Sequence, residues 1–379
     1  YVKKSGLDCI MWKEELRKCE EGYSVNGYRI TGDNYFWLNF YRLKQNDEGA
    51  KSGAGRSLTF PFFLVYQYEY FHYVELCEEL GFDVGLLKSR GIGFSEIGAS
   101  LCARPYITTS NYRVAVTAFS KNHVGPLLAK IWAQLNWLNM ETETAFKRVR
   151  MVLDTTIHKR ASKRNKDGEE CGHMSEVEGI IADKASKIRG DRCERLFYEE
   201  IGSDPIFKKK WVQGEALVTT LDDKIGTKIG WGTGGDEGVA IEGIKDLANN
   251  PNFFNVLPCR HNHTHDGREL ETSMFIPAYV TVRKLMDKRG WCDPDKGRAH
   301  YTLAREKKAS DPSGLLMYKA EYCFTIDEAL SMGGGNMFPR EELAEQLTQI
   351  EIYKTVEAPK KGHLVWNKDS DGKSNGVKW

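Results

Sequence analysis

Apolar and polar positions alternate with two different periods along this chain. In the stretch 23–44 the alternation is interrupted by turn residues at Asn26-Gly27 and at 32–34, which predicts a small β element. Aromatic residues at helical spacing fill 64–80 and stop at Gly81, which predicts a helix that ends at this glycine.

Beyond Gly81 the pattern predicts strands that alternate with helices. Short apolar runs predict strands at 82–88, 112–119, 176–182, 195–202, 227–235 and 274–282. Amphipathic stretches predict helices at 94–107 and 123–140, and a turn at 333–335 followed by another helix. This order favours an α/β fold with a mostly parallel sheet and with ligand loops at the carboxyl ends of the strands.

Composition restricts the class of protein further. The 379 residues are 28% charged, and no apolar run approaches the roughly 20 residues of a membrane helix, so we expect no membrane insertion. No apolar segment follows the start at Tyr1, so we expect no secretion signal. Nine cysteines without a CxxC pair favour reduced thiols in a cytosol. The net charge of +1 does not by itself indicate a polyanionic partner.

A glycine-rich turn joins a predicted strand to a predicted helix in GLLKSRGIGFSE, residues 85–96. Backbone N–H groups of such a turn and the positive helix N-terminus bind phosphates, and Ser95 stands where a Mg²⁺-binding hydroxyl is expected. Phe94 occupies the position of the usual lysine. Lys88 or Arg90, at the front of the turn, could supply that charge. The alternative is an ordinary connection with solvated charges.

Two adjacent carboxylates end a second predicted strand, in ERLFYEEIGSD. An ATPase needs one acid for hydrated Mg²⁺ and a neighbour that orients the attacking water, which assigns Glu199 to the metal and Glu200 to the water. A surface pair at a strand end is the alternative, although the presence of both elements makes coincidence less plausible. Thr233, at the end of 227–235, is a weaker candidate for sensing the γ-phosphate.

In their order, these motifs resemble those of the large terminase subunit, the DNA-packaging motor ATPase of tailed bacteriophages. The resemblance rests on GLLKSRGIGFS, LFYEE and GWGTGG, and on NYFWLNFYRLK and FTIDEALSMGGGNMFP, which look like segments that flank the ATPase core. KIRGDRCER stands where the family often carries an arginine–glycine stretch. The resemblance covers roughly residues 25–340. Glu199 in place of aspartate and Phe94 in place of lysine depart from the family pattern.

The resemblance implies a P-loop NTPase fold of the RecA-like, additional-strand, catalytic-glutamate type, with a mostly parallel central sheet and a small accessory subdomain. It implies hydrolysis of ATP with Mg²⁺ to translocate double-stranded DNA into a procapsid. The implied partners are a capsid portal protein, a small terminase subunit and further copies of the chain in a ring, in the host cytoplasm and transiently at the procapsid portal. A non-catalytic nucleotide- or DNA-binding scaffold and a helicase-like DNA-dependent ATPase remain alternatives.

The resemblance also implies roles for individual residues. Glu200, Lys88 and Arg90 are the expected catalytic residues, with Arg90 matching an arginine that contacts the γ-phosphate in cis. Gln67 matches an adenine-contacting glutamine, although core packing would explain its helix equally well. The expected metal ligands are Ser95 and Glu199. The expected nucleotide-binding residues are Lys88, Ser89, Arg90, Gly91, Ile92, Gly93, Phe94, Ser95, Glu96, Gln67 and Thr233.

The resemblance further implies a division of the chain. We expect an N-terminal accessory segment at 1–60, the P-loop ATPase core at 61–260, the C-terminal part of the ATPase domain at 261–345, and a linker towards a missing nuclease domain at 346–379. Asp369 and Asp371 lie in a polar, glycine-containing stretch, so we expect no nuclease activity from this chain.

Three further clusters carry candidate chemistry. CRHNHTHD offers zinc donors at Cys259, His261, His263 and His265, but their alternate spacing suits one tetrahedron poorly and favours a polar loop. The basic stretches 158–170 and 207–211 are by default solvated. The first of them, as a mobile loop between strands, is the better candidate for contacts with a DNA backbone.

Overall fold

The computed structural model describes residues 10–46, 56–142, 146, 148–221, 223–234, 239–331, 346, 365–368 and 374–378. The turn expected at 333–335 with its helix, Asp369 and Asp371 lie outside these residues. No helix of the described part is both long and apolar enough to cross a membrane.

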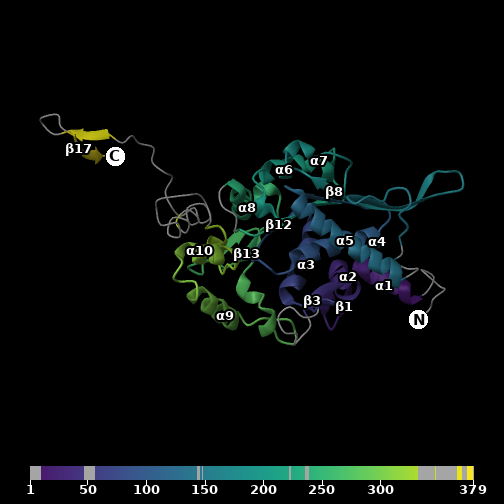
Figure 1. Ribbon diagram of the computed structural model, residues 1–379, viewed down its shortest axis with the longest axis horizontal. Helices are drawn as coiled ribbons and strands as arrows, with labels where there is room; N and C mark the ends of the chain where they lie inside the picture. Colours follow the sequence, from purple (N-terminus) through teal and green to yellow (C-terminus); the bar gives the residue numbers. More distant parts are fainter. Residues whose placement is uncertain are drawn as a thin grey trace.

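A seven-stranded sheet forms the centre of the described part of the chain, and helices surround it (Figure 1). Its strand order is β15–β5–β12–β9–β6–β8–β7. Six strands run parallel, and only the edge strand β7 runs antiparallel to its neighbour β8. The strands are β5 (Val84–Lys88), β6 (Arg113–Ala118), β7 (His158–Arg164), β8 (Glu170–Ile181), β9 (Arg195–Tyr198), β12 (Thr227–Gly232) and β15 (Met274–Ile276). The predicted α/β class with a mostly parallel sheet is confirmed.

Strand β12 lies between β5, which precedes the glycine-rich turn, and β9, which precedes the two carboxylates. In the register, Ile229 of β12 pairs with Val84 on one side and with Phe197 on the other. This inserted strand is the arrangement that the additional-strand type of P-loop fold predicts. The carboxyl ends of β5, β12, β9 and β6 therefore lie at one edge of the sheet, where ligands bind in such folds.

Helices cover both faces of the sheet, so that every residue of β5, β6, β9 and β12 is buried. One face packs against α3 (Val65–Leu80), α4 (Phe94–Thr108) and α5 (Lys121–Glu141), with α1 (Ile10–Glu21) and α2 (Gly32–Phe40) beyond them. The other packs against α6 (Phe207–Gln213), α7 (Glu215–Val218) and α8 (Val239–Asn249). The helices predicted at 64–80, 94–107 and 123–140 are confirmed with slightly shifted ends.

Shorter elements complete the described part. Five two-stranded pairs lie outside the central sheet. They are β1 (Tyr23–Val25) with β2 (Tyr28–Ile30), β3 (Leu43–Asn46) with β4 (Arg56–Thr59), β10 (Thr219–Thr220) with β11 (Asp223–Lys224), β13 (Cys259–His261) with β14 (Leu270–Thr272), and β16 (Val365–Lys368) with β17 (Ser374–Lys378). The C-terminal helices are α9 (Pro294–Glu306), α10 (Pro312–Glu321) and α11 (Ile326–Ala329).

The N-terminal prediction was right about the hairpin and wrong about the residues after it. Strands β1 and β2 pair around Asn26-Gly27 as expected. Residues 32–34, expected to be a turn of the β element, instead begin helix α2. The Thr31 hydroxyl caps this helix by accepting a hydrogen bond of 3.2 Å from the backbone N–H of Asn34, and Asp33 lies in the positive first turn.

Two predicted strands are shorter than the sequence suggested by four residues or more. Strand β9 ends at Tyr198, because Glu200 adopts a left-handed backbone conformation with φ of 49° and a 3₁₀ turn comes directly after it. Strand β15 ends at Ile276, because Pro277 has no N–H group to continue the ladder.

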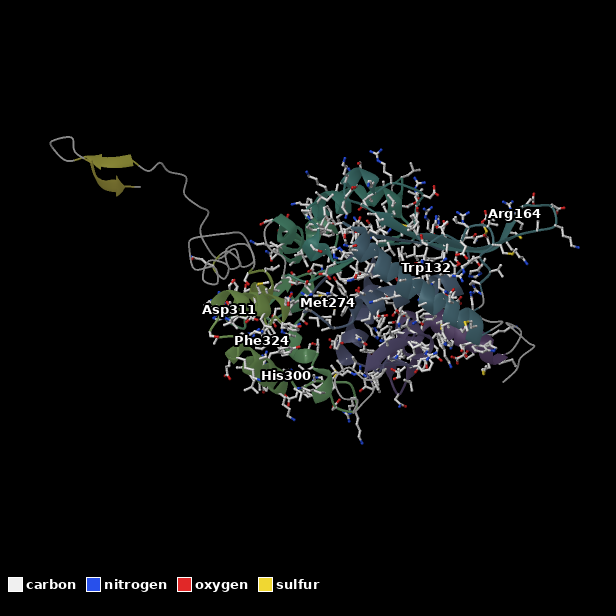
Figure 2. All side chains as sticks on the ribbon, in the orientation of Figure 1. Trp132, Arg164, Met274, His300, Asp311 and Phe324 are labelled. Atoms are coloured by element: carbon white, nitrogen blue, oxygen red, sulfur yellow. The ribbon has the colours of Figure 1, made fainter. Side chains whose placement is uncertain are left out.

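The two basic stretches are regular structure rather than loops. Residues 158–170 form β7 and the turn into β8, and the two strands continue beyond the sheet as a projecting arm with Arg164 near its tip (Figure 2). The prediction of a mobile loop there was wrong. Residues 207–211 lie in α6, where the Lys210 ammonium is buried against Asp204. This lysine is therefore not available for a DNA backbone.

A buried ion cluster joins the N-terminal helices to the sheet. Arg195 of β9 is fully buried, and its guanidinium binds Asp33 of α2 and Glu78 of α3, each at 2.7 Å. Arg104 of α4 also pairs with Asp33. Burial alone would raise the pKa of Asp33, but the two guanidinium groups lower it to about 2. The cluster fixes α2, α3 and α4 relative to β9.

We predict that Asp33→Ala lowers the free energy of unfolding by about 3–5 kcal/mol, because it leaves the buried guanidinium of Arg195 and the partly buried one of Arg104 without their shared carboxylate. The matched control is Asp246→Ala, which breaks a surface pair with Lys208 and costs at most about 1 kcal/mol. Chemical denaturation measures both. The stabilisation by Asp33 is complete above about pH 4 and is lost as the pH falls towards 2. Equal effects of the two substitutions would contradict the structural role of the cluster.

Candidate nucleotide-binding site

The glycine-rich turn leads from the end of β5 into the N-terminus of α4. Gly91 and Gly93 have φ angles of 78° and 83°, in the left-handed region that favours glycine. Phe94 is the first residue of α4, so the free N–H groups of this helix point towards the turn. The turn therefore has the backbone of a phosphate-binding loop.

The Phe94 side chain packs in the hydrophobic core, whereas the Lys88 side chain lines the cavity next to the turn. The Phe94 ring is 2% exposed and packs edge-on against Tyr70 of α3, with ring centroids 4.7 Å apart. The side chain of Lys88 is 8% exposed, and its Nζ lies 3.5 Å from Oε2 of Glu200. The cationic group that is absent at position 94 is thus present at the start of the same turn.

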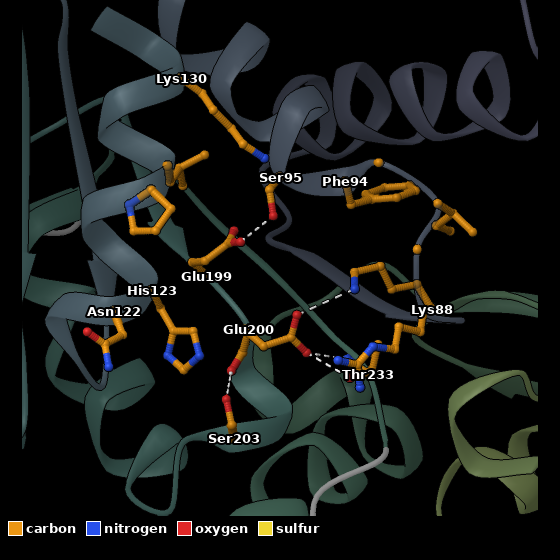
Figure 3. A pocket seen from close by; sticks show the side chains of 16 residues that line it. Lys88, Phe94, Ser95, Asn122, His123, Lys130, Glu199, Glu200, Ser203 and Thr233 are labelled. Atoms are coloured by element: carbon orange, nitrogen blue, oxygen red, sulfur yellow. Dashed lines mark hydrogen bonds and ion pairs between the residues drawn. The ribbon is translucent and has the colours of Figure 1, made fainter. Parts of the chain in front are cut away.

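The two adjacent glutamates reach the same cavity in different directions (Figure 3). Successive side chains of a strand point to opposite faces, but the left-handed conformation at Glu200 interrupts that alternation. Oε1 of Glu199 accepts a hydrogen bond of 2.5 Å from the Ser95 hydroxyl. Oε1 of Glu200 accepts bonds of 2.8 and 2.9 Å from the backbone N–H and the hydroxyl of Thr233. The strand ends of β9 and β12 are therefore joined through Glu200.

The environments of the two carboxylates give them opposite pKa shifts. Burial raises the pKa of Glu199 to about 7, with a further contribution from the neighbouring charge of Glu200. Burial acts in the same direction on Glu200, but Lys88 and the two hydrogen bonds from Thr233 hold the pKa of Glu200 below its usual value. At neutral pH Glu200 is ionised, and a bound cation would displace the proton from Glu199.

The cavity has a volume of about 540 Å³ and opens between the turn, the two glutamates and helix α5. Asn122 and His123 of α5 line it opposite the turn, whereas Lys130 of the same helix reaches towards Ser95 and pairs with Glu96. The sequence did not single out these residues. The one available signal was that the predicted helix 123–140 follows a strand whose carboxyl end lies at the same edge of the sheet.

The oxygens of Glu199 and Ser95 are suitable protein ligands for a Mg²⁺ ion. Oε2 of Glu199 is buried and has no hydrogen-bond partner, and the Ser95 hydroxyl lies against the other oxygen of the same carboxylate. Among the described residues, no group of three or more His, Cys, Asp or Glu side chains forms a metal site. Mg²⁺ is typically held by one or two protein oxygens together with phosphates and water, so this donor set is sufficient.

Arg90 is placed differently from Lys88. Its side chain is 61% exposed and forms an ion pair with Glu321 at the end of α10, although it also contributes to the cavity wall. Its backbone N–H donates to the Glu321 carbonyl at 2.8 Å. In this conformation Lys88 is the cation directed at the acid pair, and a contact of Arg90 with phosphate stays a prediction.

The remaining predicted residues surround the turn. Ser89, Gly91, Ile92 and Gly93 form it. Glu96, in the first turn of α4, accepts a hydrogen bond from the Tyr41 hydroxyl and pairs with Lys130.

Gln67 lies on the opposite side of the turn from the acid pair. It lines a second cavity of about 310 Å³, which also includes Gly91, Ile92 and Gly93. Its side-chain oxygen accepts a hydrogen bond from the indole of Trp37, and its amide group donates to the Tyr66 hydroxyl. This position next to the turn is compatible with a contact between Gln67 and the adenine base of a nucleotide. That contact stays a prediction.

The histidine-rich stretch forms hydrogen bonds rather than a metal site. Cys259 and His261 belong to β13, and the His261 ring bonds the Thr272 hydroxyl at 2.8 Å. The His263 ring bonds the Tyr279 hydroxyl at 2.7 Å. Within the described residues, the zinc alternative has no supporting geometry.

We predict opposite pH-dependent effects for the two glutamates in the metal-free protein. Because the pKa of Glu199 is raised, its ionisation destabilises the fold as the pH rises through about 7. Glu199→Gln should therefore stabilise the protein by up to about 3 kcal/mol at pH 8 and have little effect at pH 5. Glu200→Gln should destabilise it at pH 8, because the lysine loses its partner, with a smaller effect below the ordinary carboxyl pKa. Thermal unfolding across this pH range tests the pair, and shifts of the same sign would contradict the assignment.

No family model and no curated protein matches the sequence. Among solved structures, the ATPase domain of the large terminase of Thermus phage P74-26 is similar to this chain, with a TM-score of 0.43 and 13% sequence identity over 64% of this chain and 88% of that domain. The large terminase of bacteriophage HK97 gives a TM-score of 0.35 and 12% identity over 52% of this chain and 36% of its own. The large terminase of a thermophilic bacteriophage in complex with ADP gives 0.35 and 11% over 52% and 44%. All three are large terminases, the family that the sequence motifs resemble.

Proposed function

We propose that this chain is the ATPase domain of a viral DNA-packaging motor, which hydrolyses ATP to translocate double-stranded DNA into a procapsid. The observation that carries the proposal is the position of Glu200. It is an ionised carboxylate held by Lys88 and Thr233 at the ends of three neighbouring strands, next to a phosphate-binding turn and a buried oxygen pair suited to Mg²⁺.

Each group has a chemical role in this proposal. The backbone of 89–95 binds the phosphates, and Lys88 neutralises the charge on the transferred phosphoryl group. Glu199 and Ser95 hold Mg²⁺, which supplies Lewis-acid stabilisation of the phosphate oxygens when bound. Glu200 accepts a hydrogen bond from the attacking water and so orients it in line with the phosphorus.

The pKa shifts support this division of labour. An ionised Glu200 at neutral pH is able to accept the hydrogen bond from water that its role requires. A dication held by Glu199 and Ser95 would favour the ionised form of Glu199, so metal binding and loss of the Glu199 proton would be linked. Thr233 contacts Glu200 directly and is therefore placed to respond to a phosphate next to it.

The wider role follows from the motif resemblance. On that basis we include ATP and Mg²⁺ as substrate and cofactor, double-stranded DNA, a capsid portal protein and a small terminase subunit as partners, and a homo-oligomeric ring at the procapsid portal in the host cytoplasm. Residues 61–260 would then form the ATPase core and 261–345 its C-terminal part. Residues 346–379 would lead towards a nuclease domain.

We predict that Glu200→Gln lowers DNA-stimulated ATP hydrolysis by about a hundredfold or more while ATP binding is retained, because the amide orients water poorly but leaves the phosphate loop intact. Glu269→Gln, an exposed glutamate outside the site, is the matched control and should match the wild type. Equally negligible hydrolysis by the wild type and Glu200→Gln in an oligomerisation-competent protein would favour the non-catalytic scaffold. Binding to a capsid portal protein separates a packaging motor from a helicase.

We predict that Lys88→Ala weakens both ATP binding and turnover, because Lys88 is buried at the site and faces Glu200. Arg90→Ala should preserve most of the binding, since its guanidinium lies at Glu321. Nucleotide titration and steady-state hydrolysis measure the two effects. If both substitutions leave ATP binding and turnover unchanged, the hypothesis that Lys88 or Arg90 supplies the charge absent at position 94 is wrong.

A further inference from the structure

Residues 283–308 form the most basic continuous part of the C-terminal region. They contain nine Lys or Arg and four Asp or Glu, a net charge of +5 in a chain whose total is +1. The rest of the chain is therefore net negative. This stretch comprises the 3₁₀ turn Arg283–Leu285, the loop after it and helix α9, and we call it the basic surface.

The cations of the basic surface are exposed. Eight of the nine are exposed, and Arg305 is half-buried. Six of the exposed cations form no ion pair with any described residue: Lys284, Lys288, Arg289, Lys296, Lys307 and Lys308.

Two of the four acids accept hydrogen bonds from backbone N–H groups. Asp287 accepts hydrogen bonds from the N–H groups of Arg289 and Trp291, and Asp293 caps α9. Both carboxylates keep their negative charge, so the surplus of the basic surface is the net charge of +5.

Three of these cations, Lys284 of the turn and Lys296 and Lys307 of the helix, share one surface. Lys284 of the turn lies close enough to His300 of α9 to add to the effect of burial in lowering the pKa of that imidazole. Lys296 and Lys307 are spaced so that they share one side of the helix with His300. Helix α9 has 13 residues and is about 20 Å long, a length over which duplex DNA carries about a dozen phosphate charges.

The basic surface is connected to the nucleotide site through neighbouring residues. Arg283 lines the cavity that contains Gly91 and Gly93 of the phosphate-binding turn. The backbone N–H of Ser89 donates to the Ile276 carbonyl at 3.1 Å, a few residues before the surface begins. A polyanion bound here would therefore contact a segment that adjoins the turn.

The projecting arm is the competing surface, and its charges cancel. Its tip, residues 163–170, contains the cations Lys163, Arg164 and Lys166 together with the acids Asp167, Glu169 and Glu170. Figure 1 places the arm and α9 at opposite ends of the molecule. The basic surface is thus the better match for a polyphosphate.

We propose that the basic surface binds the phosphate backbone of duplex DNA. The proposal rests on the proposed function, which makes DNA the polyanion that this chain meets. Long, exposed, unpaired lysine and arginine side chains provide sequence-independent affinity through release of the counterions on the phosphates. The sequence had pointed instead to 158–170, where three acids offset three of the five Lys and Arg residues.

The test compares two triple variants of the full chain that each remove three positive charges. The surface variant is Lys288→Gln, Lys296→Gln and Lys307→Gln, and the matched control is Lys163→Gln, Arg164→Gln and Lys166→Gln in the arm. A fluorescent duplex DNA of mixed sequence is titrated at several salt concentrations. The surface variant should bind at least about tenfold more weakly at moderate salt, and the slope of log affinity against log salt should fall by about three. The control should bind like the wild type.

The outcomes separate this inference from the proposed function. Any of three results overturns the inference. The surface variant binds duplex DNA as well as the wild type, the arm variant loses as much affinity as the surface variant, or the wild type does not bind duplex DNA. Basal ATP hydrolysis without DNA should be the same in all three proteins, because none of the substituted residues lines the nucleotide site. Weaker DNA binding by the surface variant would stand even if the wild type hydrolysed no ATP. Unchanged binding alongside normal hydrolysis would overturn only the inference.

Discussion

The ion pair between Lys88 and Glu200 is the interaction on which the site depends. It joins the end of β5 to the end of β9, and the two hydrogen bonds from Thr233 add the end of β12. The half-buried Glu200 carboxylate needs these partners, since withdrawing a charge from water without a partner is costly. The left-handed backbone of Glu200, which costs about 1–3 kcal/mol, is the conformation that brings the carboxylate to these partners.

The same arrangement gives two adjacent and chemically identical side chains different properties. Lys88 and Thr233 use up the favourable contacts near Glu200, which leaves Glu199 with one hydroxyl donor and one oxygen without a partner. Burial of Glu199 then outweighs the lowering effects of the Ser95 hydrogen bond and of the Lys88 and Lys130 charges, and raises its pKa to about 7. A dication would relieve this imbalance, because it would add positive charge next to the oxygen that has no partner. The metal site and the water-orienting site are therefore two consequences of one distribution of charge.

The sequence could predict the parts of this site that are formed by residues close together in the chain. The glycine-rich turn, the strand before it and the acid pair were identified because each depends on residues close together in the chain. It could not decide between Lys88 and Arg90, since that depends on Glu321 and Glu200, both more than a hundred positions away. The α5 residues of the cavity were missed for the same reason.

The fold was predictable where helices and strands have a buried side. Helices α3, α4 and α5 cover the sheet, so their apolar spacing was visible in the sequence. Helix α9 was not, because most of its residues are exposed and Gly297 is its buried position. The start of α2 was mistaken for a turn because glycine, aspartate and asparagine favour both turns and helix N-termini, and the cap at Thr31 decides between them.

The end of β12 connects the acid pair to the C-terminal helices by close packing. A side chain at Gly202 would overlap the carbonyl of Thr233, and a side chain at Gly234 would overlap the carbonyl of Ala329 at the end of α11. The backbone after β12 is thus held between the turn that carries Glu200 and the last described helix. Closely packed interiors move as units rather than deforming continuously. The backbones of these segments touch without any long side chain between them, which explains why glycine occupies 202 and 234.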